Sequence, residues 1–245
     1  MSPLNEGNNT RERIGTAHMH KAMLISAIAL TLLLSTAARA ADSTNSNATT
    51  PPSSVQASQE EELYQAWVKE KTPKVFLEYF RRFPQGSHRD AIASDICQQW
   101  GFKKIDGAPL LVRFRGYHAD SKMKVHDGKS YEGWPPQPVM TDVLAKEGSV
   151  YFSAAIEFLA LADTRVTMKD LAFRSKESKD SILPNRFNLV GMMAVQGADL
   201  EMTLEKMPQV VVEAFWEVKS DQVQEPVVSI FKSQFDLKEM KVEKL

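Results

Sequence analysis

The chain has 245 residues, of which 43% are hydrophobic and 25% charged, with a formal net charge of −1. This composition is typical of ordinary globular domains, and the length leaves room for one or two of them. Basic and acidic residues are balanced and form no Lys/Arg stripe. We therefore predict that neither nucleic acid nor an anionic lipid surface is a partner.

The N-terminal segment predicts export. Lys21 precedes the apolar run Ala22–Ala38, and the run ends in the small-residue pattern Ala38-Arg39-Ala40, which is typical of a secretory signal peptide. We expect a signal peptide over residues 1–40 and a mature chain that is periplasmic or extracellular. The alternative is an uncleaved anchor, because the run reaches the lower limit of about 17–25 residues for a membrane-spanning helix. Contact with a membrane is expected only in that case.

Residues 41–58 predict a flexible linker. They are rich in Ser, Thr, Asn and Pro, and Val55 is their only large apolar side chain. A segment of this composition buries too little apolar surface to offset the entropy lost on ordering.

The single cysteine, Cys97, excludes an intramolecular disulfide. It falls in an apolar helical pattern, which favours a core side chain over a nucleophile, since no histidine lies in a pairing pattern around it. The chain also lacks the G-x-S-x-G, Walker-type, G-x-G-x-x-G and H-E-x-x-H fingerprints. We predict no cofactor, and we favour a non-catalytic protein over an enzyme.

Residues 59–104 predict three short helices. Ser58 with Glu61 fits a capping box for the first, and Pro73 suits the opening of the second. The second helix is expected to end before Pro84, which disfavours helical geometry in the residue that precedes it. We expect the first helix to run from its cap Ser58 to about Lys71 and the second from its cap Thr72 to Phe83. The third is expected to begin at its cap Ser87 and to include Trp100.

The stretch "FLEYFRRFPQGSHRDAIASDI" within these helices has a helix ending in Phe-Pro, a Gly-Ser turn and small apolar residues afterwards. It resembles the tetratricopeptide-like helical hairpin of bacterial envelope proteins over about residues 59–101. The resemblance implies a role in protein interaction. The chain departs from an array because only one such unit is found, whereas stacked repeats need about three.

Four aromatic residues recur at helical spacing in the second predicted helix: Phe76, Tyr79, Phe80 and Phe83. Such a stripe either docks on the protein's own second domain, which we favour, or binds a partner.

From Ile105 to Leu245 the hydrophobic period shifts toward 2. In "VVVEAFWEV" the even positions are apolar, and "VVSIFKSQFDL" alternates with apolar odd positions, as half-buried antiparallel strands do. Residues 150–161 are rich enough in Ala and Leu to be either a strand or a buried helix, and the tail "LKEMKVEKL" is unresolved. Further strands are expected at 110–117, 122–126, 165–174, 187–195 and 201–205.

The predicted fold is therefore α+β, with a short N-terminal helical hairpin unit over 59–104 and an antiparallel β-sandwich over 105–245. An immunoglobulin-like sandwich and a small barrel are the alternatives within that class.

The stretch "GYHADSKMKVHDG" carries the candidate metal ligands. We expect residues 112–118 and 122–126 to pair as a hairpin, with Asp120 and Asp127 serving as ordinary turn residues. The alternative is a transition-metal site with two histidines and one carboxylate, the centre of a metal-dependent hydrolase. Its ligands would be His118, Asp120, His126 and Asp127.

The stretch "KSYEGWPPQP" places Tyr131 and Trp134 in a loop stiffened by prolines. Aromatic rings on such a loop either cover the edge of the sandwich or bind a sugar or peptide. We predict a protein-interaction or ligand-binding module of the cell envelope with a protein partner. A carbohydrate-binding accessory module is an alternative.

Overall fold

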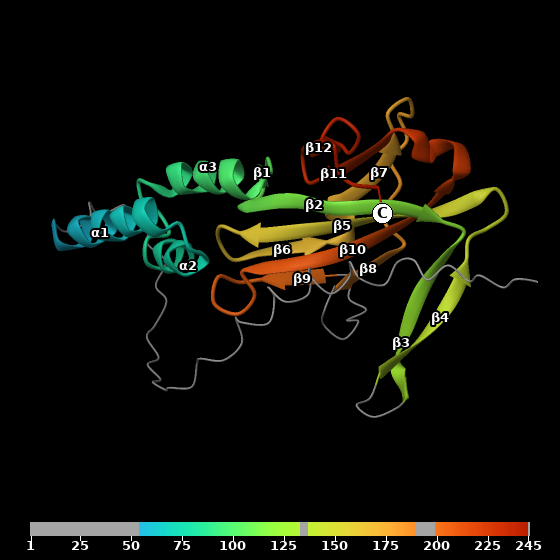
Figure 1. Ribbon diagram of the computed structural model, residues 1–245, viewed down its shortest axis with the longest axis horizontal. Coiled ribbons are helices and arrows are strands. Elements are labelled where there is room, and N and C mark those ends of the chain that lie inside the picture. The colour runs from blue at the N-terminus through green and yellow to red at the C-terminus, as the bar shows by residue number, and fades with distance from the viewer. Residues whose placement is uncertain (1–53, 133–136, 190–198, 245) are drawn as a thin grey trace, which may run out of the picture. The chain divides into compact units, whose positions relative to one another are not determined.

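The computed structural model describes residues 54–132, 137–189 and 199–244, and for residues 125–131, 137 and 138 it describes the backbone alone. The predicted signal peptide and residues 41–53 of the predicted linker lie outside the described residues. Contacts group Pro51–Leu245 into one compact unit. In this unit three helices precede the β-strands (Figure 1).

The helices are α1 (Ser54–Glu70), α2 (Pro73–Arg82) and α3 (Arg89–Trp100). Helix α2 begins and ends as predicted. Thr72 Oγ1 accepts a hydrogen bond from the backbone N–H of Val75 at 3.4 Å, Pro73 occupies the first turn and Phe83 is the C-cap. Local cap chemistry therefore determines this helix.

Two predicted helix starts are wrong. Helix α1 begins at Ser54, so Ser58 lies inside it and residues 54–58 are helical instead of linker, because no Gly or Pro interrupts the chain after Pro52. Ser87 does not cap α3. Its N–H and Oγ both donate to Glu60 Oε1, at 2.6 and 3.0 Å. The Ser87 side chain is therefore directed at a carboxylate of α1, and its oxygen accepts no hydrogen bond from the first turn of α3.

The strands form two main sheets and two ribbons, and all their pairings are antiparallel. The five-stranded sheet has the order β1 (Lys103–Lys104), β2 (Leu110–Asp120), β5 (Ser149–Ala160), β10 (Gln209–Lys219) and β8 (Arg186–Leu189). The three-stranded sheet has the order β12 (Ser233–Asp236), β11 (Pro226–Ile230) and β7 (Leu171–Ser175). The ribbons are β3 (Lys122–Glu132) with β4 (Gln137–Leu144), and β6 (Thr164–Thr167) with β9 (Asp199–Met202).

The two main sheets pack face to face, which makes the protein α+β with a β-sandwich, as predicted. Phe152 of β5 contacts Phe173 of β7 with ring centroids 4.7 Å apart, and Phe114 of β2 contacts Phe235 of β12 at 5.4 Å. Trp216 of β10 lies fully buried beside Phe152. In each of these strands the apolar side chains at alternate positions point into the layer between the two sheets.

The structure decides two segments that the sequence left open, residues 150–161 and the tail, and it corrects the prediction for a third. Residues 150–160 lie in the strand β5 and not in a helix, and β5 is largely apolar because it is central in its sheet, between β2 and β10. The stretch "VVSIFKSQFDL" is two strands where we predicted one, since the chain turns at Phe231, whose φ is 51°. The tail forms turns and a single parallel bridge from Lys244 to Tyr117.

The predicted strand over 165–174 is also interrupted. The short 3₁₀ helix Met168–Asp170 separates β6 from β7, and Thr167 caps it with its side chain. Of the strand predicted over 187–195, only the part up to Leu189 lies within the described residues.

Arginine side chains join the helices to the sandwich through backbone carbonyls. Arg81 donates to Leu204 O from Nε at 2.8 Å, Arg89 donates to Leu161 O, and Arg113 of β2 donates to Trp100 O at 2.6 Å. The buried apolar side chains of the helices and of the strands also belong to one hydrophobic cluster.

Candidate functional site

The aromatic stripe of α2 is not a surface. Phe76, Tyr79, Phe80 and Phe83 are at most 4% exposed, and their rings contact one another. The guanidinium of Arg89 lies over the Phe80 ring at 4.2 Å. The hypothesis that these side chains bind a partner is therefore wrong, because the protein's own packing already covers them.

The hydroxyl of Tyr79 ties the helices together. It donates to Glu60 Oε1 at 2.6 Å and accepts from the backbone N–H of His88 at 3.1 Å. Burial and the bond to Glu60 raise the pKa of Tyr79 above its ordinary range. Burial also opposes ionisation of Glu60, but bonds from Tyr79 and Ser87 outweigh it and lower the pKa of that carboxyl.

The predicted hairpin between residues 112–118 and 122–126 is wrong, because β2 pairs with β5 while β3 pairs with β4. The His118 ring contacts Ser153 Oγ, 2.9 Å from Nδ1. Asp120 accepts from the N–H of Lys122 at 3.3 Å, as a turn residue does. The side chains of His126 and Asp127 lie outside the described ones, and among the described residues no three His, Cys, Asp or Glu side chains converge as metal ligands.

A β-bulge at Arg115 determines which side chains of β2 share a face. Phe114 lies opposite Ile156 and Gly116 lies opposite Ala155, so Arg115 is an extra residue in the strand. It shifts the alternation by one position. As a result Arg113 before the bulge and His118 after it lie on the same side of the sheet, and Phe114 and Tyr117 face the core.

We call this side the polar face. Its centre is Glu157 of β5, which is 1% exposed. Glu157 accepts bonds from Arg113 Nε at 2.7 Å, from Arg115 Nη2 at 2.9 Å and from Gln209. Burial alone would raise the pKa of Glu157, but the bonds from Arg115, Arg113 and Gln209 outweigh it and lower the pKa. The members of the polar face that the argument uses are Arg113, Arg115, His118, Ser153, Glu157, Gln209 and Glu213.

The polar face also carries the chain His118–Ser153–Glu213. Ser153 Oγ donates to Glu213 Oε1 at 3.1 Å and is 1% exposed. In a nucleophilic triad the histidine lies between the serine and the carboxylate and takes the serine proton. Here the serine lies in the middle, and its proton is directed at the carboxylate. This arrangement fixes side chains and does not activate a nucleophile.

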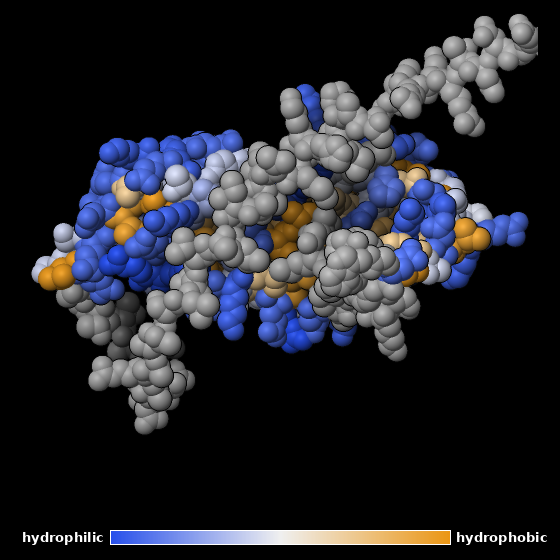
Figure 2. All heavy atoms as spheres, turned by 60° about the horizontal axis from the view of Figure 1, so that its bottom comes forward, coloured by the Kyte–Doolittle hydropathy of each residue, from blue (hydrophilic) through white to orange (hydrophobic). Residues whose placement is uncertain are grey.

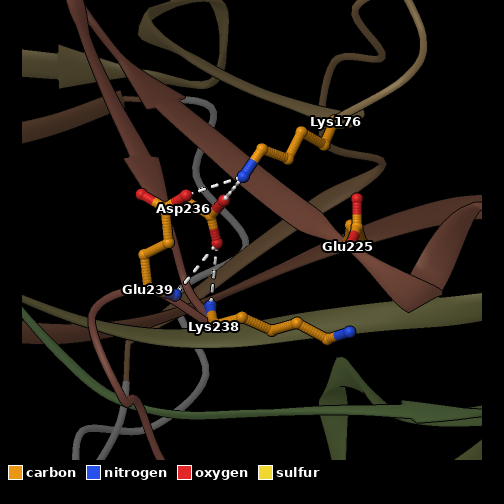
Figure 3. A pocket seen from close by; sticks show the side chains of 5 residues that line it. All are labelled: Lys176, Glu225, Asp236, Lys238 and Glu239. Atoms are coloured by element: carbon orange, nitrogen blue, oxygen red, sulfur yellow. Dashed lines mark hydrogen bonds and ion pairs between the residues drawn. The ribbon is translucent and has the colours of Figure 1, made fainter.

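A shallow depression of about 270 Å³ is lined by Lys176, Glu225, Asp236, Lys238 and Glu239 (Figure 3). Another of about 270 Å³ lies on α2 and is lined by Lys74, Leu77, Glu78, Arg81 and Arg82. Lys176 Nζ lies 3.0 Å from Asp236 and 2.6 Å from Glu239, so the ammonium already fills the space between the carboxylates. Asp236 also accepts from the N–H groups of Lys238 and Glu239, each at 3.1 Å. The side chains of Lys176, Asp236 and Glu239 form an ion-pair network, and no bond joins the side chains of Glu225 and Lys238 to it (Figure 3).

The β3–β4 ribbon differs from the β6–β9 ribbon because it exposes large apolar side chains, whereas Val166, Leu200 and Met202 of β6–β9 are buried. Its strands pair only with each other among the described strands, and Figure 1 shows them leaving the ends of β2 and β5 as a separate unit. On β4, Met140 is 46% exposed, Val143 36% and Leu144 73%. Elsewhere among the described residues the exposed large hydrophobic side chains are Val55, Val68 and Leu183, and on the face shown in Figure 2 hydrophobic atoms gather in patches between hydrophilic ones.

We did not predict β4 from the sequence, because the prolines after Trp134 indicated a loop. The alternation of Val139, Thr141 and Val143 was a usable signal. Tyr131 lies on β3 with its backbone opposite Pro138, its side chain is outside the described ones, and Trp134 falls in residues 133–136, outside the described residues. Carbohydrate binding by this pair therefore stays a prediction.

Cys97 is half-buried, and this burial raises the pKa of its thiol. The positive charges of Lys103 and Lys104 lower that pKa but only partly offset the effect of burial. A thiol of raised pKa is a poor nucleophile, which favours the packing role.

No protein-family model matches the chain, and no curated protein matches it. Among solved structures it is similar to an uncharacterized β-sandwich protein from Clostridium difficile 630, with a TM-score of 0.34 and 11% identity over 52% of this chain and 82% of that chain. None of the helices in the described residues has the length and apolar character needed to cross a membrane.

Proposed function

We propose that the chain is a non-catalytic exported protein of the cell envelope that binds a protein partner through the β3–β4 ribbon. The observation that carries the proposal is a two-stranded ribbon that pairs with no other strand of the described residues and that exposes Met140, Val143 and Leu144. Export is supported by the signal-peptide pattern of residues 1–40.

The ribbon has apolar side chains on both of its faces. Residues directly opposite each other share a face, and Leu144 lies opposite Lys122 while Val143 lies opposite Met123. Leu144 and Val143 are successive residues, so they point to opposite faces. A surface ribbon of a monomer normally has one apolar face on the core and one polar face in water. This ribbon is built differently, which supports contact with another protein.

The expected stability of an isolated two-stranded ribbon also supports a binding partner. A two-stranded hairpin alone is at best marginally stable in water, and three or more strands or a packing partner are normally needed. The cross-strand ion pair of Lys122 and Asp142, at 2.6 Å, is exposed and adds little. A partner that adds a strand to the ribbon would supply what it lacks, and strand addition is a common mode of protein recognition.

The experiment places a photo-cross-linking amino acid at Met140 or Leu144 in the full chain, in cells that produce it. Leu183, which is 54% exposed and lies outside the ribbon, is the matched control. We expect an adduct of the same mass from both ribbon positions and none from Leu183. Equal labelling at Leu183, or no adduct from the ribbon, contradicts the proposal.

A further inference from the structure

Within the part of the chain that the structure describes, the outer edges of β3 and β4 are unpaired, and that of β4 is the one suited to strand addition. Beyond its pairing with β4, β3 presents Lys122 and Lys124 and is irregular after His126, where the register with β4 shifts. Lysines and bulges are the usual protections of an edge strand. Strand β4 carries one charge, Asp142, and that charge is already paired with Lys122.

The sequence of β4 is self-complementary. Val139, Thr141 and Val143 alternate on one face, so the pattern is symmetric about Thr141. If two copies of β4 pair antiparallel about Thr141, the two threonines oppose each other and each Val139 opposes Val143 of the other copy. Pairs of threonines and of β-branched residues are among the favourable cross-strand pairs.

The other face excludes the neighbouring symmetric register. Pairing about Thr141 sets Met140 opposite Asp142 of the second copy, and no like charges meet. Pairing about Asp142 would oppose two carboxylates, which is destabilising. Charge therefore favours the register about Thr141 over the register about Asp142.

We propose that the occupant of the β4 edge is β4 of a second copy of this chain, paired antiparallel about Thr141. This inference rests on the proposed function of the ribbon as the binding element. The contact is isologous, and the two ribbons become one four-stranded sheet across a two-fold axis. Four strands exceed the three that a sheet needs for independent stability. Eight residues per strand make a small interface, below about 1,200 Å² in total, so the dimer dissociates on dilution.

Disulfide trapping tests the register in the full mature chain carrying Cys97→Ala, so that the introduced cysteine is the only one. Thr141→Cys is expected to form a covalent dimer under mild oxidation, because opposed Cβ atoms lie about 4.5–5.5 Å apart. Met140→Cys and Val143→Cys are the matched controls and are expected to stay monomeric, since each lies opposite a different residue. Mixing Val139→Cys with Val143→Cys chains restores a covalent dimer.

Sedimentation equilibrium gives the second measurement, over about 1–100 µM, the range in which weak dimers dissociate. The parent chain is expected to dimerise with concentration, and Thr141→Lys, which opposes two ammonium groups, to lose the dimer. Leu183→Lys is the control and keeps it.

A parent chain that is monomeric throughout, or equal trapping of Thr141→Cys and Met140→Cys, overturns the inference. The failure of the inference is distinct from that of the proposed function. An adduct from Met140 whose mass is not that of two copies rejects the second copy and retains a partner at the ribbon.

Discussion

Glu157 lies directly opposite Arg113 in the β2–β5 pair, and its buried carboxylate accepts the Arg113 Nε–H at 2.7 Å. Removing the carboxylate with Glu157→Ala leaves Arg113 and Arg115 without their partner. We expect the free energy of unfolding to fall by about 3 kcal/mol, the lower end of the range for a broken buried pair, because half-exposed Arg115 can turn to water. Urea denaturation measures the loss. Exposed Glu147→Ala is the control and should change stability by less than about 0.5 kcal/mol.

The same carboxylate makes stability depend on pH. Its pKa in the folded protein lies below the ordinary value of 4.5, so its contribution is fully present above pH 4.5 and is lost as pH falls through the folded-state pKa. We expect the difference in Tm between the parent and Glu157→Gln to shrink as pH is lowered below 4.5. A difference that is constant or larger at low pH would contradict the assignment.

The buried aromatic stripe predicts a large effect on stability and none on recognition. Phe80→Ala opens a cavity in the helical packing and removes the ring under Arg89, so we expect a loss of about 3–5 kcal/mol. The milder Phe80→Leu should leave cross-linking from Met140 unchanged. Exposed Val68→Ala is the stability control. A loss of cross-linking in a folded Phe80→Leu protein would restore the stripe as a binding surface.

Lys71 lies at the end of α1 with φ 48°, and its N–H donates to Trp67 O at 2.9 Å. Glycine adopts this left-handed geometry without the cost that a side chain incurs. The ion pair that Lys71 makes with Asp95, at 3.5 Å, is partly exposed and contributes little. We expect Lys71→Gly to stabilise the protein by about 0.5–1 kcal/mol. Lys69→Gly, inside the helix, should destabilise it by about 1 kcal/mol. Thermal unfolding of both variants checks the opposite signs.

The exposed ribbon separates stability from association. Met140→Lys and Leu144→Lys change side chains that are exposed. We therefore expect the free energy of unfolding of the monomer, measured at low concentration, to change by less than about 0.5 kcal/mol. Binding to the partner should be lost. A variant that unfolds the sandwich would indicate that these side chains pack inside the chain.

The parts of the fold that local sequence determines were predictable. The helical periodicity of residues 59–100, the Thr72-Pro73 cap and the alternation of β10 follow from neighbouring residues, and the structure has these elements. The α+β class with a β-sandwich follows from them. The boundaries of the signal peptide, the resemblance to a tetratricopeptide-like hairpin and the envelope location stay predictions.

The parts that depend on distant residues were not predictable. Ser87 loses its cap role to Glu60, which lies 27 residues earlier, and His118 finds Ser153, which lies 35 residues later. The partner of β2 is separated from it in sequence by the whole β3–β4 ribbon. No periodicity in a single strand specifies which strand lies beside it, so the expected pairing of β2 with β3 failed.

The bulge also makes β2 tolerant of a change in length. Loss of the single codon of Arg115 would remove the bulge and leave Gly116 opposite Ala155, Tyr117 opposite Ala154 and His118 opposite Ser153, so the side chains beyond it would keep their faces. Loss of one codon within β10, whose pairing with β5 has no register shift, would turn the side chains beyond the deletion to the other face of the sheet. Reading-frame-preserving deletions of one codon should therefore be found more often in functional copies at Arg115 than within β10.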